Sequence, residues 1–145
     1  MTAATSAFGV VVSIGQGDAA TVLPGVDVFD AIGELTSCQS PNETRERIEV
    51  TNFDSAAKEF ISGLKDGGEA QFEMNFVPGD AGQASVRAAF DSGQLRNFRI
   101  VFTDAATTTL DFKVLVLEKP VASGGVGEAL TASMTVKVSG AVTWT

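Results

Sequence analysis

Alternation of apolar and polar residues is the dominant pattern along this chain. In residues 71–76, 97–102, 110–116 and 132–139, every second residue is apolar. A period of two is typical of a strand that is covered on one face and polar on the other. Weaker patterns of the same kind predict further strands at residues 8–14, 26–37 and 47–53. The chain is therefore predicted to be mainly β.

A short α-helix is predicted over about residues 80–92. Pro78 and Gly79 indicate a turn, and Asp80 after them is a natural N-cap. Gln83, three residues later, gives a weak form of the capping box. The apolar residues Val86, Ala89 and Phe90 fall on one helical face, and Gly93 stands where a helix stop belongs.

Residues 38–65 are predicted to form a long loop with some structure of its own. They begin with a polar turn region around Pro41 and continue into the alternating segment 47–53. For residues 54–68 the pattern leaves two alternatives, a loop with one helical turn or a continuation of the preceding arm. Ala56, Phe60 and Leu64 have helical spacing, whereas Gly63 disfavours a helix. Long excursions from a compact domain are usually functional.

These elements predict a two-sheet β-sandwich or squashed barrel, in which the helix covers one open side. A chain of 145 residues is long enough for one core, and residues 1–145 are expected to form a single domain. The 10 Phe residues supply most of the bulk for that core. No apolar run approaches the roughly 20 residues that cross a bilayer, and residues 1–16 lack the basic start of a signal peptide.

The composition argues against an enzyme and against a metal or cofactor site. The chain has no His, one Cys and no Tyr, so the usual zinc sites, an imidazole base and an aromatic sugar platform are not available. Asp27 with Asp30 is better interpreted as surface acids than as a calcium site, because alternating oxygen ligands are missing. The net charge of -8 disfavours nucleic-acid binding, which uses Lys and Arg against phosphates.

The order and spacing of several short motifs resemble one protein family. The sequence GLKDGG at residues 63–68 leads into a strand, then NFVPGD at residues 75–80, then an alanine-rich helix that ends in glycine. Two strands over residues 95–119 and the closing GEALTASMTVKVSGAVTWT continue the match, which covers about residues 8–143. This arrangement is similar to the tail tube, or major tail, proteins of long-tailed non-contractile phages and to the related tubes of gene transfer agents.

The resemblance implies a structural virion protein, made in the cytoplasm of a bacterial host and located in the virion tail. Six subunits would close into a ring, and stacked rings would form a conduit for delivery of the genome into the host cell. DNA and a tape-measure protein would pass through the lumen, and a tail tip or baseplate and a tail terminator would bind the tube ends. No membrane and no sequence-specific nucleic-acid binding are implied. Phage and gene transfer agent are not distinguished.

Two sets of site residues follow from this resemblance. Contacts between rings are expected from the long loop, through the charged residues Glu43, Arg45, Glu46 and Arg47 and the apolar residues Phe53, Phe60 and Ile61. The lumen is expected to be acidic or neutral so that DNA slides, and Glu73 and Asp111 on polar strand faces are the candidates to line it. Alternatively, these faces meet solvent or a neighbouring subunit.

Composition and strand count also permit a different class, a monomeric β-sandwich module for binding or adhesion on a larger assembly. Such modules usually expose an aromatic cluster, and none can be identified in this sequence. Secreted modules often carry disulfides, which a single cysteine cannot form within one chain. Hollow filaments or rings in electron micrographs would favour the tube over the module.

Overall fold

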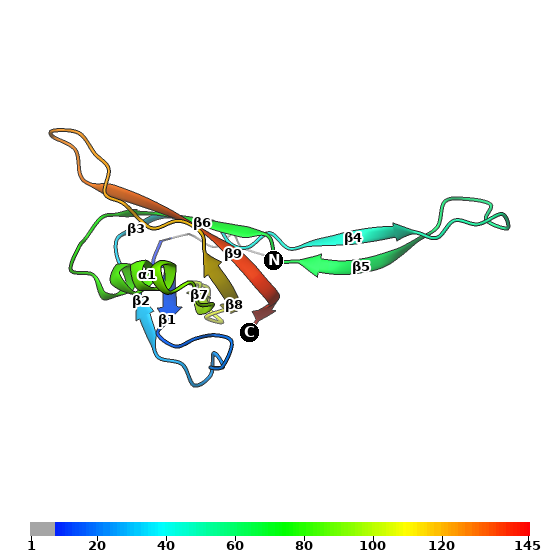
Figure 1. Ribbon diagram of the computed structural model, residues 1–145, viewed down its shortest axis with the longest axis horizontal. Helices are drawn as coiled ribbons and strands as arrows, with labels where there is room; N and C mark the ends of the chain where they lie inside the picture. Colours follow the sequence, from blue (N-terminus) through cyan, green and yellow to red (C-terminus); the bar gives the residue numbers. More distant parts are fainter. Residues whose placement is uncertain (1–7) are drawn as a thin grey trace.

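Strands are the main regular secondary structure in the computed structural model, which describes residues 8–145 (Figure 1). The predicted single domain also includes residues 1–7, which lie outside the described residues. In chain order the elements are β1 (Val11–Gly15), β2 (Phe29–Ala31), β3 (Leu35–Cys38), β4 (Thr44–Glu49), β5 (Phe60–Asp66), β6 (Glu69–Asn75), α1 (Ala81–Ser92), β7 (Arg96–Val101), β8 (Thr109–Val116) and β9 (Thr131–Trp144).

Seven strands form one antiparallel sheet in the order β2-β1-β7-β8-β9-β6-β3. The long strand β9 joins its two halves, because residues 131–137 pair with β6 and residues 136–144 pair with β8. The edge strands β2 and β3 are only 3 and 4 residues long. Short edges limit the unpaired main chain that a sheet presents to other molecules.

The sheet curls so strongly that its two halves face each other across the core. Phe72 on β6 and Phe98 on β7 have ring centroids 6.0 Å apart, although β8 and β9 lie between their strands. In a flat sheet, strands three places apart would be separated by about 14 Å. Phe98 also packs against Phe112, its cross-strand partner on β8. The curl corresponds to the predicted squashed barrel and confirms the mainly β fold with one helix.

Helix α1 packs against β1, β2 and β8 and closes one side of the core (Figure 1). The Asp80 side chain caps its start by accepting a hydrogen bond from the Gln83 backbone N–H at 2.9 Å, and Gly93 ends it in the left-handed conformation. The predicted helix and both caps are confirmed. Val86 and Ala89 are fully buried, whereas Phe90 at the rim of this face is 39% exposed.

Gln83 has a larger role than the capping box predicted for it. Its side chain is fully buried, and the Asp80 N–H that a capping box would satisfy donates instead to the Val77 carbonyl oxygen. The Gln83 amide accepts from Val77 N–H at 3.1 Å and donates to the carbonyl oxygens of Gly33 and Asn75 at 3.2 and 2.9 Å. One side chain therefore joins the helix, the end of β6 and the turn before β3.

Strands β4 and β5 form a separate two-stranded sheet, a hairpin that projects away from the seven-stranded body (Figure 1). We call residues 43–66 the arm and the remaining described residues the body. The sequence predicted a long loop with some structure of its own over residues 38–65, and within this segment residues 44–49 and 60–65 are paired strand, joined by residues 50–59. Of the two alternatives for residues 54–68, the continuation of the arm agrees with the structure, and the helical turn is wrong. The β-branched residues Ile48, Val50 and Ile61 favour an extended ladder over a helix.

Three strand predictions also differ from the structure, and the first is the strand expected over residues 47–53, which is β4 at Thr44–Glu49. Residues 26–37 were expected to form one strand, but the chain bends at Gly33 and Glu34 and gives the separate strands β2 and β3. Glu34 has a φ of 60°, which no continuous strand allows. Its main-chain oxygen accepts from Asn75 N–H at 2.8 Å, so this turn is tied to β6. The first strand begins at Val11 rather than Phe8.

Candidate assembly site

The root of the arm is fixed by two consecutive glycines between β5 and β6. A Cβ atom on Gly67 would lie 2.4 Å from Val138 Cγ1, so no side chain fits there without displacing β9. Gly68 has a φ of +69°, and a Cβ on it would lie 2.7 Å from the Asn42 carbonyl oxygen. Both ends of the arm are thus held against the body by close backbone approach.

An ion pair joins the arm to the body at the same place. Lys137 Nζ on β9 lies 3.0 Å from Asp66 Oδ1 at the end of β5. The same carboxylate oxygen accepts from the Gly68 backbone N–H at 2.9 Å. Both contacts hold the pKa of Asp66 below its ordinary value, and the hydrogen bond from Gly68 has a larger effect than Lys137. The direction in which the arm leaves the body is therefore set by the close approach of the two glycines and by the Lys137–Asp66 ion pair.

One face of the arm carries three basic side chains close together, and we call it the basic face. Arg45 and Lys65 are direct cross-strand partners, and Arg47 is two residues from Arg45 on the same strand. Residues two apart in a strand share a face, as do directly opposite residues. The Arg47 guanidinium lies 5.2 Å from the centroid of the Phe60 ring. This surface therefore combines three cations with one aromatic ring, that of Phe60, over which Arg47 lies.

The other face of the arm is apolar and acidic. Ile48 and Ile61 are direct cross-strand partners, with exposed fractions of 48% and 54%. Glu46 and Val50 share this face with Ile48, because each lies two residues from it. At the tip, Phe53 is fully exposed, and the turn beneath it is held by hydrogen bonds from Asp54 and Ser55 to Asn52. Apolar side chains exposed on both sides of one ribbon indicate a surface that another molecule covers.

The structure places all seven predicted contact residues together on this arm, and every one of them is exposed: Glu43, Arg45, Glu46, Arg47, Phe53, Phe60 and Ile61. The sequence prediction missed Ile48, Leu64 and Lys65, which lie on the same hairpin. No local signal would have placed Lys65 beside Arg45, because a register shift between Arg45 and Arg47 sets that pairing. Whether these residues touch another subunit stays a prediction.

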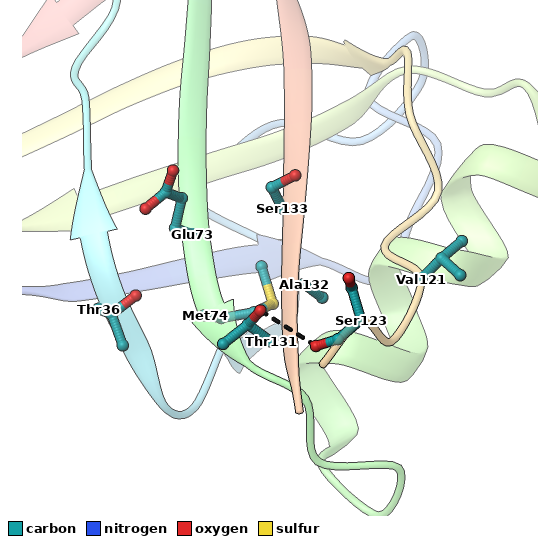
Figure 2. Close-up of a pocket in the computed structure, with 8 residues that line it drawn as sticks. All are labelled: Thr36, Glu73, Met74, Val121, Ser123, Thr131, Ala132 and Ser133. Atoms are coloured by element: carbon teal, nitrogen blue, oxygen red, sulfur yellow. Dashed lines mark hydrogen bonds between the residues drawn. The ribbon is translucent and has the colours of Figure 1, made fainter. Parts of the chain in front are cut away.

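Glu73, one of the two residues predicted to line a lumen, is exposed on the sheet face opposite the core. It lies on β6 between the buried residues Phe72 and Met74, with Ser133 of β9 as its cross-strand partner. Figure 2 shows it at a shallow groove of about 350 Å³, to which the loop before β9 also contributes. The groove is lined by Thr36, Glu73, Met74, Val121, Ser123, Thr131, Ala132 and Ser133.

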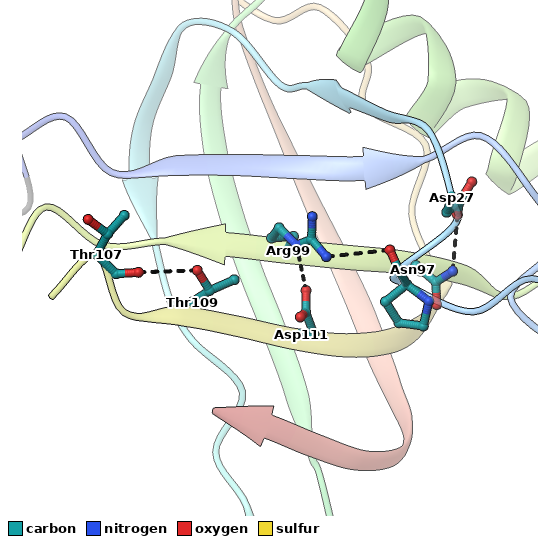
Figure 3. Close-up of polar contacts among 7 residues, drawn as sticks. Asp27, Asn97, Arg99, Thr107, Thr109 and Asp111 are labelled. Carbon is teal, nitrogen blue, oxygen red and sulfur yellow. Dashed lines mark hydrogen bonds and ion pairs between the residues drawn. The ribbon is translucent and has the colours of Figure 1, made fainter. Parts of the chain in front are cut away.

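Asp111, the second predicted lumen residue, is engaged within the chain. Its Oδ1 lies 2.8 Å from Arg99 Nε, and its side chain is only 17% exposed (Figure 3). Arg99 also lies 4.4 Å from the centroid of the Phe29 ring and donates to the Pro24 carbonyl oxygen at 3.4 Å. Asp111 and Glu73 share the polar side of the sheet, but a paired carboxylate contributes far less net negative charge than a free one.

Arg99 and Asn97 together hold residues 16–28 over this part of the sheet, a role that the sequence did not reveal. The Asn97 amide is fully buried and donates to Val22 O and Asp27 Oδ2, each at 3.0 Å. Figure 3 shows the contact with Asp27. Asp27 also accepts from the Gly17 backbone N–H. Asp27 is therefore a part-buried structural acceptor beneath the loop, and not the solvated surface acid that the sequence suggested.

Among residues 8–145, no three His, Cys, Asp or Glu side chains gather in a way that would hold a metal ion. The described part of the chain contains no helix long and apolar enough to cross a membrane. The arrangement that the structure does build is a projecting two-faced arm and a polar sheet face, which are features of an assembly subunit rather than of a catalytic cleft.

The sequence of the chain matches one family model, that of the lambda phage tail tube protein, over residues 12–145. The chain therefore belongs to this family and is a structural subunit of a tail tube in the tail of a phage-like particle. The match favours a tube subunit over the monomeric binding module. No curated protein sequence matches the chain.

Solved structures share the fold at low sequence identity. A chain from the tail of an empty gene transfer agent particle, refined with C6 symmetry, has a TM-score of 0.72 and 15% identity; the alignment covers 98% of this chain and 99% of that one. The tail tube of phage SPP1 has a TM-score of 0.68 and 16% identity, with 97% and 78% covered. A chain of the anti-feeding prophage baseplate has a TM-score of 0.69 and 10% identity, with 100% and 97% covered.

Proposed function

We propose that six copies of this chain close into a ring and that rings stack into a hollow tube. The tube conducts DNA and a tape-measure protein during genome delivery. A head-to-tail ring needs two different surfaces on each subunit. The C6 symmetry of the similar gene transfer agent tail supports six as the number.

Stacking is the role that we assign to the arm, and its exposed apolar side chains are the observation that carries the proposal. Phe53, Phe60, Ile61 and Leu64 are between 45% and 110% exposed on a hairpin that has no core of its own. Burial of one large apolar side chain contributes about 1.5–3 kcal/mol. In a ring of six subunits, the same burial occurs six times. Exposed ion pairs contribute only about 0–1 kcal/mol each, so Glu43, Arg45, Glu46 and Arg47 add less to affinity than to orientation.

The lumen is assigned to the polar face of β6, β8 and β9. This face carries Glu73, Asp111, Ser133 and Thr135, together with Lys113 and with Lys137, which is paired with Asp66, and it lies opposite the buried aromatic side chains. Acidic and polar residues there would keep DNA phosphates from binding, since phosphate binding requires Lys and Arg. Of the two candidates, the exposed carboxylate of Glu73 supports this role better than the paired carboxylate of Asp111.

The proposed tube binds a tail tip or baseplate at one end and a terminator at the other, and it performs no catalysis. The family is a structural one, which supports a non-enzymatic role. A chain from the tube-terminating cap of the anti-feeding prophage has a TM-score of 0.70 at 12% identity, so a related fold also occurs at the end of a tube.

Electron microscopy of the concentrated protein, with and without seeds of sheared tails, tests the proposal. We expect hollow filaments of uniform width with six-fold end views. The matched variant replaces residues 45–65 by an Asn-Gly turn, which is feasible because Thr44 and Asp66 are direct cross-strand partners. This variant should keep the melting temperature of the body and form no filaments. Filaments of normal length from the armless variant would overturn the role of the arm.

A further inference from the structure

The basic face of the arm is electrostatically unfavourable in the isolated subunit. Arg45 and Lys65 are opposite each other across the hairpin, and like charges in that position destabilise a strand pair. Among the described residues, the ion pairs within 4.0 Å are formed by Arg99, Lys119 and Lys137, and Arg45, Arg47 and Lys65 have none. All three are exposed. An arrangement that costs stability in the free chain indicates a partner that supplies the missing anions.

The basic residues are also separated from the acidic residues of the arm. Glu46 lies between Arg45 and Arg47 in sequence and therefore points to the opposite face, with Ile48. Glu49 at the end of β4 and Glu43 directly before its start flank the basic face, and the structure pairs neither of them with its cations. The basic face is thus a compact cationic surface between two carboxylates, in a chain whose net charge is -8.

We propose, on the basis of the tube function above, that the basic face binds carboxylates on the body of a second copy of this chain. The arm contains six acidic and four basic residues, whereas the rest of the chain contains twelve and six. The body therefore holds most of the negative charge, and three of its six basic residues, Arg99, Lys119 and Lys137, are already paired. The basic face and the body are complementary in charge, and a polymerising subunit meets its own body at every contact.

A nucleic-acid partner fits this surface less well. Phosphate binding needs several cations without nearby anions, but Glu43 and Glu49 border the basic face and the arm as a whole is acidic. Carboxylates are isolated anions that a planar guanidinium binds in a bidentate manner, which suits Arg45 and Arg47. The contact of Arg47 with the Phe60 ring restricts its guanidinium before binding and so lowers the entropy lost on association.

The test compares the double variant Arg45→Glu and Arg47→Glu with Lys58→Glu, a charge reversal at the arm tip outside the basic face. Because the double variant places a carboxylate opposite Lys65 in place of a guanidinium, we expect the melting temperature of the isolated subunit to stay unchanged or rise. The concentration needed for filament formation should rise at least tenfold, and its dependence on salt should become weaker than in the wild type. Lys58→Glu should leave that concentration within about twofold of the wild-type value.

The outcomes separate this proposal from the tube function itself. If the wild type forms filaments and the double variant does so at the same concentration and with the same salt dependence, carboxylate binding by the basic face is wrong and the tube function stands. If wild-type protein forms no filaments even with seeds, both fail. Retardation of a 30-base-pair duplex by wild type but not by the double variant would assign the basic face to nucleic acid instead.

Discussion

The rings of Phe72 and Phe98 lie 6.0 Å apart at the centre of the core, although their strands are three places apart in the sheet. This contact exists only because the sheet curls, and it places β6 opposite β7. The three aromatic rings of Phe72, Phe98 and Phe112 form a continuous cluster of tilted pairs through this point. The stability of the body should therefore depend strongly on each of them.

Phe98→Ala is expected to destabilise the subunit by about 3–5 kcal/mol, since it removes a fully buried ring from between two others. Urea unfolding, monitored by circular dichroism, measures this loss of unfolding free energy. Phe53→Ala is the matched control, because that ring is fully exposed, and its free energy of unfolding should change by about 0.5 kcal/mol or less. The control should nevertheless weaken filament formation. Equal stability losses in the two variants would contradict the assignment of Phe53 to the arm surface.

Gln83→Leu should cost about 2–5 kcal/mol, although it replaces a polar residue by an apolar one of similar size. The substitution leaves the Val77 N–H and the Gly33 and Asn75 carbonyl oxygens without their buried partner. Thermal unfolding compares it with Gln39→Ala on the exposed edge, which should be nearly neutral. A stability gain in Gln83→Leu would show that this buried network does not hold the helix to β6.

Gly67→Val is expected to displace the arm. Its Cβ would meet Val138 Cγ1 at 2.4 Å, and overpacking of this kind costs about 1–3 kcal/mol. Gly79→Ala is the control, because nothing lies within 4 Å of its added Cβ. Small-angle scattering and filament assays should show a changed arm direction and loss of assembly for Gly67→Val alone. Normal filaments from Gly67→Val would mean that the root does not set the geometry of the contact.

Acid should weaken the arm root and the turn before β8. The pKa of Asp66 is lowered by the Gly68 N–H and Lys137, and that of Asp104 by the Thr108 hydroxyl and N–H. Because both pKa values are lower in the folded chain, their contribution is present above the unfolded value of about 3.9 and disappears as pH falls below it. The decline in melting temperature between about pH 5 and pH 3 should be shallower in a double Asp→Asn variant at these two positions. An unchanged pH profile would contradict these assignments.

Glu73→Lys tests the proposed lumen. The side chain is exposed, so subunit stability and filament formation should be near normal, but a ring of six lysines would bind DNA phosphates and slow genome ejection. Glu128→Lys makes the same charge change in the loop between β8 and β9, away from the sheet face, and should eject DNA normally. Normal infectivity of Glu73→Lys particles would argue against a lumenal position.

Local sequence patterns predicted the type of most elements correctly. Alternation placed Phe72, Phe98, Phe112 and Met134 on buried faces, because a strand has a fixed period of two whatever surrounds it. Asp80 and Gly93 fixed both helix ends, because caps act on neighbouring backbone groups within one turn. The seven contact residues were found together on the arm for the same local reason, since they lie within one short segment of the chain.

How these elements meet depends on contacts between distant parts of the chain. The curl that joins Phe72 to Phe98, the pairing of Asp111 with Arg99 and the three-way contact of Gln83 each link residues far apart in the sequence. The arm became a hairpin rather than a loop through cross-strand pairs such as Ile48 with Ile61, and Arg45 met Lys65 in the same way. A periodicity shows which face a residue occupies, but strand register and sheet curvature, which depend on the whole chain, determine its neighbours.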